Sequence, residues 1–231
     1  MVKKSGEKYQ AIIEAAIKVI AKYGYHSSQV SRIAREAGVA DGTIYLYFES
    51  KEDLLISLFR NKMGLFTNEA PNELKGLKDP FEILARLISK HFSKLQANRN
   101  LASVLQIQLR QSELSIRQSI SEIVQEYYQL IEKFVRYGIE EGSFRQDIDP
   151  VIAREIIFGC LDQVSTCWVL SNSKYDLTER ASPVYHLLAQ GLALSSKARS
   201  FSEDWFLQNS LEPLIRRHND SSIKGISLLH Y

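Results

Sequence analysis

The chain has 231 residues, of which 45% are hydrophobic and 24% are charged, and its net charge is +2 at pH 7. These totals fit a globular chain with a real core, and the net charge is too small to indicate nucleic-acid binding by itself. No stretch is long enough for a membrane span, and no apolar run follows Lys3 and Lys4. We therefore expect a cytoplasmic protein with no signal peptide.

Helical periodicity runs through almost the whole chain, and the helix breakers are few, at 11 glycines and 5 prolines. The sequence predicts an all-α fold of about nine helices. Residues 1–50 are expected to form a three-helix domain and residues 51–194 a second helical domain. Residues 195–231, which contain Trp205 and Phe206, are expected to be a partly ordered extension with one short helix near 202–214.

The first expected helix ends at Gly24, and two short helices follow over Ser28–Ala37 and Asp41–Tyr47. The tight turn Gly38-Val39-Ala40 joins them. Two short helices with such a turn are typical of a helix-turn-helix, whose second helix enters the DNA major groove. Residues 1–65 hold ten Lys and Arg against seven Asp and Glu, a mildly basic balance that suits phosphate contact.

The second helix of this motif offers several groups to DNA. Gly42 allows close backbone approach, and Thr43 has a hydroxyl and a methyl that suit a phosphate oxygen or a thymine methyl. Tyr45 and Tyr47 offer phenolic hydroxyls, although residues two apart on a helix point about 200° apart, so both cannot face DNA squarely. Lys51 adds a cation at the start of the next helix.

Further helix starts are marked by capping residues, and a loop over 68–78 is the best candidate for a boundary. The expected starts are Ser50, Asp79-Pro80, Asn98, Ser112 and Asp149-Pro150, and the last firm helix is expected over Leu177–Leu194.

The helix expected over 149–171 has apolar residues over an arc of about 200°, whereas a surface helix needs a stripe only a little over 100° wide. A second subunit is the simplest cover for the excess, with the helix over 177–194 as its partner in a four-helix interface. Asp162 and Gln163 are expected at its rim. Cys160 and Cys167 lie about 10 Å apart along the helix, too far for a disulfide. The expected interface residues are Ile156, Cys160, Val164, Trp168, Val184 and Leu188.

The sequence offers only a few candidate ligand contacts. His91 lies on the apolar face of its helix, where a core role and a ligand contact are both open. In the block Leu105–Ser112, Arg110 stands beside strongly apolar helices, and Arg117 follows shortly after. An arginine beside an apolar cavity suits a ligand with an anionic head and a long apolar tail, although surface salt bridges explain both arginines as well.

The run Ile33–Leu54 resembles the signature of the tetracycline-repressor (TetR) family almost position for position. The resemblance implies a homodimeric, all-helical repressor with a DNA-binding head and a divergent ligand-binding body. Ser28, which stands where the family often has Thr, and Gln29 are then expected to touch phosphate. The whole expected DNA-binding set is Ser28, Gln29, Arg32, Asp41, Gly42, Thr43, Tyr45, Tyr47 and Lys51.

Within that family, residues 8–194 resemble the regulators of fatty-acid degradation, notably in Leu105–Ser112, Ile156–Gly159 and Ser173–Leu177. This resemblance implies a long-chain acyl-CoA as inducer, with arginines for its phosphates and a tunnel between helices for its tail. We expect no metal and no other cofactor. The residues expected to bind the ligand are Arg110, Arg117, His91, Gln106 and Leu109.

Three alternatives remain open. A repressor of an efflux pump that senses a lipophilic cation is the nearest, and a buried Asp or Glu in the pocket would favour it. An enzyme is not expected, because no GxSxG, HExxH, CxxC or phosphate-loop pattern occurs. A helical interaction protein without DNA binding is the third.

Overall fold

The computed structural model describes residues 6–67, 76–110, 113–172, 174–194, 201–202, 204–206 and 208–209. Within these residues there are nine α-helices and one short 3-10 helix, which confirms the all-α class. The elements are α1 (Glu7–Tyr23), α2 (Val30–Ala37), α3 (Asp41–Tyr47), α4 (Lys51–Thr67), α6 (Pro80–Ala97), α7 (Arg99–Gln108), α8 (Leu114–Glu140), α9 (Pro150–Leu170), η1 (Thr178–Arg180) and α10 (Ala181–Leu192).

Four of the predicted helix starts carry the side-chain caps that the sequence indicates. In each, a side-chain oxygen accepts a hydrogen bond from a backbone N–H of the first turn, which would otherwise have no partner. The accepting side chains are those of Ser50, Asp79, Asn98 and Asp149, at 3.1, 2.9, 2.9 and 2.8 Å from the nitrogens. The predicted start at Ser112 and most of the loop over 68–78 lie outside the described residues.

One predicted helix is divided. The segment expected to run from Leu177 to Leu194 begins as η1 and continues as α10. The backbone N–H of Leu177 donates to Oε1 of Gln96 on α6, at 2.5 Å. This tertiary contact anchors the chain before the helix begins, and periodicity alone does not reveal it.

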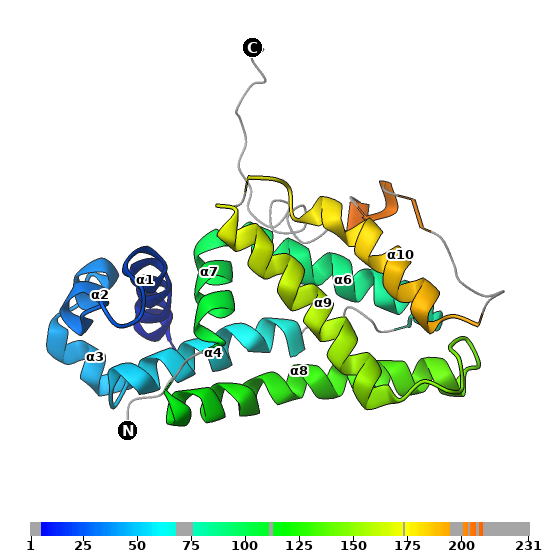
Figure 1. Cartoon of the computed structure of the whole chain (residues 1–231). Coiled ribbons are helices and arrows are strands. Elements are labelled where there is room, and N and C mark those ends of the chain that lie inside the picture. The colour runs from blue at the N-terminus through cyan, green and yellow to red at the C-terminus, as the bar shows by residue number, and fades with distance from the viewer. Residues whose placement is uncertain are drawn as a thin grey trace, which may run out of the picture.

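The first three helices form a compact head at one end of the molecule (Figure 1). Ile12, Ile33 and Ile44, one from each helix, are buried together in the core. Gly38 ends α2 in the left-handed region, with φ 68°, and its N–H donates to the carbonyl of Arg35. The sharp turn expected there is therefore confirmed, and it sets α3 across α2.

A second group of helices, α6 to α10, forms the body, and α4 runs into it from the head (Figure 1). α4 packs against α1 of the head and along α8 of the body, while α7 of the body also packs against α1. Lys62 of α4 forms an ion pair with Glu14 of α1. The head is thus joined to the body through both α4 and α7.

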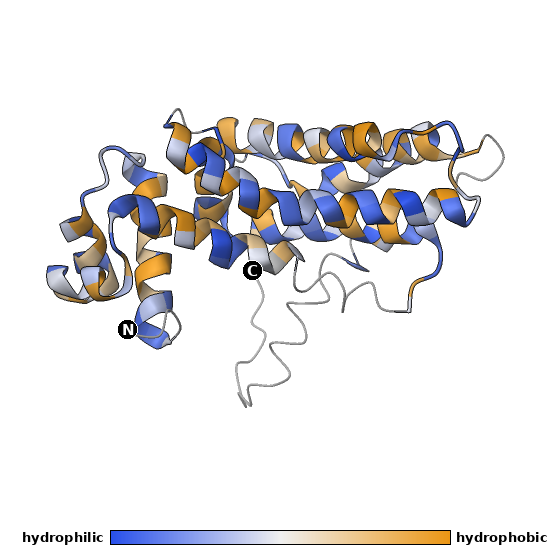
Figure 2. Cartoon of the chain, turned by 90° about the horizontal axis from the view of Figure 1, so that it is seen from below, coloured by the Kyte–Doolittle hydropathy of each residue, from blue (hydrophilic) through white to orange (hydrophobic). Residues whose placement is uncertain are grey.

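Hydrophobic and hydrophilic residues alternate along the helices, as expected for helices that each bury one face (Figure 2). The packing is tight where α8 ends, since a Cβ added to Gly138 would lie 2.2 Å from the buried ring of Phe144. In the described part of the chain, no helix is long and apolar enough to cross a membrane.

Candidate functional site

α3 lies at the surface of the head. Tyr45 is 58% exposed, and its neighbour Leu46 is also strongly exposed. Asp41 and Gly42, at the start of α3, and Gln29, just before α2, are exposed as well, and Thr43 is half-buried. A short helix that presents its side chains to solvent in this way is free to enter a DNA groove. Leu46 is a member of this surface that the sequence analysis did not select.

Ser28 does not belong to the exposed surface, and here the sequence expectation is wrong. Its side chain is fully buried, and its hydroxyl donates to the carbonyl of Gly24 at 2.6 Å. The helix begins later, at Val30, with Gln29 in the capping position. The hydroxyl therefore closes the turn between α1 and α2 and is not available to a phosphate.

Three other expected DNA contacts are partly occupied within the head. The Arg32 guanidinium lies 4.1 Å from the centre of the Tyr23 ring, and the half-buried Tyr47 packs near Tyr9. The Lys51 ammonium donates to the carbonyl of His26 at 3.1 Å, and partial burial lowers the pKa of this lysine. These contacts hold the side chains in place. Their contact with DNA stays a prediction.

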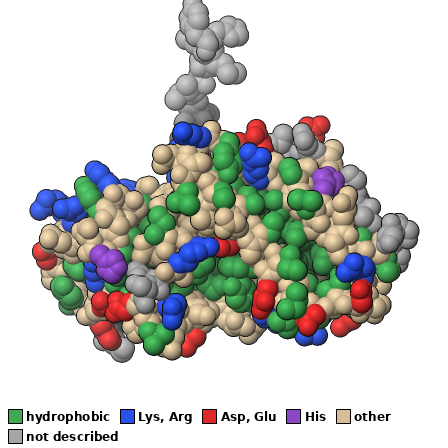
Figure 3. Space-filling model, viewed as in Figure 1, with side chains coloured by type: hydrophobic (Ala, Val, Ile, Leu, Met, Phe, Trp, Pro, Cys, Tyr) green, Lys and Arg blue, Asp and Glu red, His purple; other side chains and the backbone are tan. Residues whose placement is uncertain are grey.

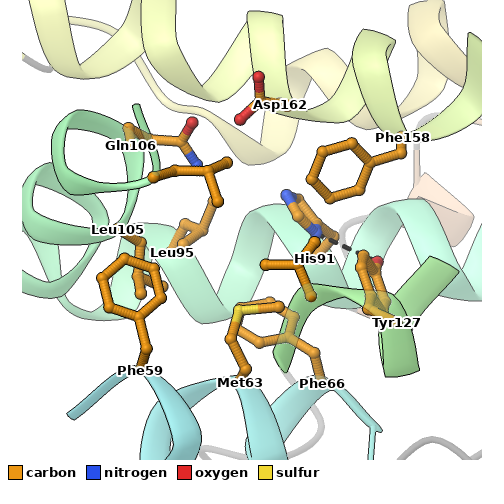
Figure 4. A pocket seen from close by; sticks show the side chains of 12 residues that line it. Phe59, Met63, Phe66, His91, Leu95, Leu105, Gln106, Tyr127, Phe158 and Asp162 are labelled. Atoms are coloured by element: carbon orange, nitrogen blue, oxygen red, sulfur yellow. Dashed lines mark hydrogen bonds between the residues drawn. The ribbon is translucent and has the colours of Figure 1, made fainter. Parts of the chain in front are cut away.

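The body contains an apolar cavity between α4, α6, α7, α8 and α9, and this cavity is partly open to solvent. Figure 4 shows side chains from these helices pointing toward one another around it. The lining is mostly aromatic and aliphatic, which suits an apolar ligand. It consists of Phe59, Met63, Phe66, His91, Leu95, Leu105, Gln106, Leu109, Val124, Tyr127, Phe158 and Asp162.

His91 is one of the buried polar groups of the cavity wall. Its Nδ1 lies 3.2 Å from the hydroxyl of Tyr127, and among the described residues its Nε2 has no hydrogen-bond partner. Burial, with a smaller contribution from the Lys94 charge, lowers the pKa of His91 to about 3. The histidine is therefore neutral at ordinary pH, and in this form one of its ring nitrogens is a hydrogen-bond acceptor and the other a donor.

At the end of α7 the cavity wall becomes polar. Arg110 donates to Oδ2 of Asp162 at 2.5 Å and to the carbonyl of Gln106 at 2.9 Å. The Gln106 amide, turned with its nitrogen toward the carboxylate, donates to Asp162 at 2.8 Å. Asp162 carries a side chain that is 11% exposed, so the ion pair shields most of this acid from water.

Only some of the residues expected to bind the ligand lie at the cavity. His91, Gln106 and Leu109 line the cavity, and Arg110 contacts its wall through Asp162. Arg117 is exposed on α8 and does not line it. Asp162, expected at the rim of a dimer face, points into the cavity instead, because it lies one turn after Phe158 on the inner face of α9. That spacing is the signal that could have found it.

A different face of α9, together with α10, is apolar and exposed. Ile156 is 58% and Leu187 is 73% exposed, and Cys160 and Val164 are half-buried beside them. The space-filling view shows hydrophobic side chains gathered over these two helices (Figure 3). For Trp168 and Val184 the expectation needs correction, because both side chains are buried within the protomer. Leu188 lines the same apolar groove as Ile156 and Leu187, so its place at the interface stays a prediction. The indole N–H of Trp168 donates to the carbonyl of Tyr175 at 2.8 Å.

A head with an exposed helix-turn-helix, joined to a helical body with an apolar cavity, is the arrangement of a one-component transcription regulator. The chain belongs to the TetR family. The family described as "Bacterial regulatory proteins, tetR family" matches residues 12–58, and the one described as "YsiA-like protein, C-terminal region" matches residues 59–191. The resemblance in the helix-turn-helix is thereby confirmed.

The relatives point to one subgroup. The chain is 48% identical over 190 residues to the fatty acid metabolism regulator protein of Bacillus subtilis. The matched region covers 82% of this chain and 98% of that protein. A crystal structure of FadR from Bacillus subtilis in complex with stearoyl-CoA has a TM-score of 0.77 and 48% identity, over 80% of this chain and 99% of that one. FadR from Bacillus halodurans, a fatty acid degradation regulator, gives the same values.

Proposed function

We propose that the protein is a homodimeric repressor that binds a palindromic operator, is released from it by a long-chain acyl-CoA and controls genes of fatty-acid degradation in the cytoplasm. The observation that carries the proposal is the apolar cavity, with Arg110 at its polar edge, between helices that also contact the head. The stearoyl-CoA held by the Bacillus subtilis relative supports the same ligand class.

The chemistry of the cavity wall supports both parts of such a ligand. The aromatic and aliphatic wall suits an acyl chain, since burying each CH₂ contributes about 0.8 kcal/mol. Arg110 suits a phosphate, because its guanidinium offers paired donors. Its present partner, Asp162, would lose this cation when a phosphate takes it. We infer that the ion pair holds the arginine at the edge of the cavity until the ligand arrives.

Asp162 also gives the alternative ligand class its one supporting observation, because a buried acid could attract a lipophilic cation. Its charge is already compensated by Arg110, so a cation would meet a neutral pair. The relatives named above regulate fatty-acid metabolism, which also favours the acyl-CoA.

The route from ligand to DNA is proposed to be α4. Phe59, Met63 and Phe66 of this helix line the cavity, while Lys51 at its start contacts the head. A ligand that separates α4 from α9 shifts the helix that carries the head. Release then requires only that the ligand binds the shifted conformation more tightly.

The test begins with a duplex selected by the protein from a random-sequence library, which is then titrated with and without stearoyl-CoA in a fluorescence anisotropy assay. Saturating stearoyl-CoA is expected to weaken DNA binding roughly 10–100-fold, the usual size of an allosteric coupling. Coenzyme A and free stearate, each alone, serve as controls for the two parts of the ligand. Unchanged DNA affinity at saturating stearoyl-CoA would contradict the proposed mechanism.

Arg110→Gln separates the ligand site from the DNA site. The variant is expected to bind stearoyl-CoA roughly 10- to 150-fold more weakly, because a hydrogen bond to a charged group contributes about 1.5–3 kcal/mol, while DNA affinity without ligand stays unchanged. Isothermal titration calorimetry measures the first quantity and anisotropy the second. Arg136→Gln, on the exposed side of α8, is the matched control. Arg117→Gln, tested in parallel, decides the role of the second expected arginine.

Thr43→Ala combined with Tyr45→Ala tests the reading head. Each lost contact to a base or phosphate is expected to weaken DNA binding by about 1–3 kcal/mol, so the pair is expected to lose roughly 100-fold. Binding of stearoyl-CoA should be unchanged, since neither residue lines the cavity. DNA affinity that survives both changes would favour a helical interaction protein that does not act through this helix.

A further inference from the structure

The aromatic tail segment, by which we mean residues 201–202, 204–206 and 208–209, lies beyond residue 191, where the family match ends. The relative from Bacillus subtilis is matched over 98% of its length by only 190 residues of this chain. The segment is thus an addition to the body that the family description does not cover.

This segment returns to the body and packs against it. Phe206 is 2% exposed, and Phe201 is also buried. Their rings lie 5.6 and 5.3 Å from the ring of Tyr185 on α10, measured between centroids. The Ser89 hydroxyl of α6 donates to the carbonyl of Phe206 at 3.4 Å. A tail that buries aromatic rings and meets a buried hydroxyl is docked on the body.

The segment is also organised for this contact. Ser202 caps a short helical turn, since its Oγ accepts from the N–H of Trp205 at 3.2 Å. Trp205 packs on Phe201, with 4.5 Å between ring centroids, and the Arg86 guanidinium of α6 lies 5.9 Å from the indole ring. α6 and α10 therefore contact the same aromatic cluster.

α6 lies between this cluster and the cavity. Ser89 contacts the tail, while His91, two residues later and on the opposite side of the helix, lines the cavity and carries the unpartnered Nε2. Leu95, one turn further, lines the cavity too. α6 thus contacts the tail on one side and forms part of the cavity wall on the other.

We propose that the aromatic tail segment is an intramolecular clamp that holds α6 against the body and thereby keeps the cavity wall in its ligand-binding position. This proposal depends on the proposed function only in that stearoyl-CoA is taken as the ligand of the cavity. If the ligand binds only molecules in which the cavity wall is ordered, its apparent affinity falls as the fraction of such molecules falls.

Phe206→Ala in the full-length protein tests the clamp. In hydrogen exchange without ligand, the amides of α6 are expected to exchange at least about 10-fold faster, while those of α1 to α3 keep their rates. Stearoyl-CoA is expected to bind about 5–10-fold more weakly, with DNA affinity in its absence unchanged. Gln208→Ala, an exposed change in the same segment, is the matched control and should leave all three quantities as they are.

The outcomes are distinct. Unchanged exchange in α6 overturns the clamp, and so does faster exchange with an unchanged affinity for stearoyl-CoA. If Phe206→Ala loosens the whole chain, Trp205→Ala decides, because the half-buried indole is outside the main core. Local loosening of α6 in that variant supports the clamp, and its absence overturns it. If the wild-type protein does not bind stearoyl-CoA, the proposed ligand is wrong. The hydrogen-exchange rates of α6 then test the clamp by themselves.

Discussion

Ile156→Glu is expected to convert the protein into a monomer and to weaken binding to its selected operator by a factor of 10² to 10⁴, the range that loss of a linked second site produces. Ile156 lies at the centre of the exposed apolar face of α9, near Leu187 of α10. A glutamate there would have to lose its water on dimerisation without a partner for its charge, which costs several kcal/mol.

The effect on DNA follows from the geometry of the head. α3 has only seven residues, so the number of side chains that it can present to a DNA groove is small even though Asp41, Tyr45 and Leu46 are exposed. One head therefore makes few base contacts. A two-fold dimer presents two heads to half-sites about 34–36 Å apart, or multiples of this, and the second head binds at a high effective concentration.

Sedimentation velocity and anisotropy with the selected duplex measure the two effects. Leu114→Glu is the matched control, because it places the same charge on a similarly exposed apolar side chain of α8, away from this face. It should leave the mass and the DNA affinity unchanged. A dimer that persists in Ile156→Glu would move the interface to another surface.

His91 is expected to make the protein less stable in mild acid. The pKa of this side chain is about 3 in the folded protein, against an ordinary value of 6.5. Between these two values the unfolded chain binds a proton that the folded protein does not, so stability falls as the pH decreases. From pH 7 to pH 5, the loss in the free energy of unfolding from this group is about 2 kcal/mol.

His91→Gln is expected to remove this part of the pH dependence while keeping a polar group near Tyr127. Urea unfolding at pH 7, 6 and 5, at one protein concentration, measures the difference between variant and wild type. His26→Gln, at an exposed position of the head, is the control and should keep the wild-type slope. A wild-type slope in His91→Gln would show that the folded protein tolerates a charged His91.

Much of the fold could be predicted because its signals are local. The capping residues Ser50, Asp79, Asn98 and Asp149 act on backbone groups two or three residues away, and Gly38 is needed for a left-handed turn. Such interactions are complete within one turn of chain, so spacing is enough to find them.

The errors share one physical cause. The wide apolar arc on the helix over 149–171 indicates that a large apolar surface must be buried. The arc does not show whether the protomer, a ligand cavity or a second subunit buries it. The protomer itself buries Trp168, the cavity receives Asp162, and only the sector with Ile156 stays exposed. Ser28 shows the same limit, because its hydroxyl bonds to the turn after α1 and not to its own helix.

The sequence by itself determined the helices, their caps and the helix-turn-helix over 28–48, because periodicity and turn chemistry act over a few residues. Only the tertiary structure decided which face of each helix meets the core, the cavity or the solvent. It also showed that Ser89 contacts the tail while His91 lines the cavity. Those assignments depend on contacts between segments more than 30 residues apart in the chain, which no local pattern encodes.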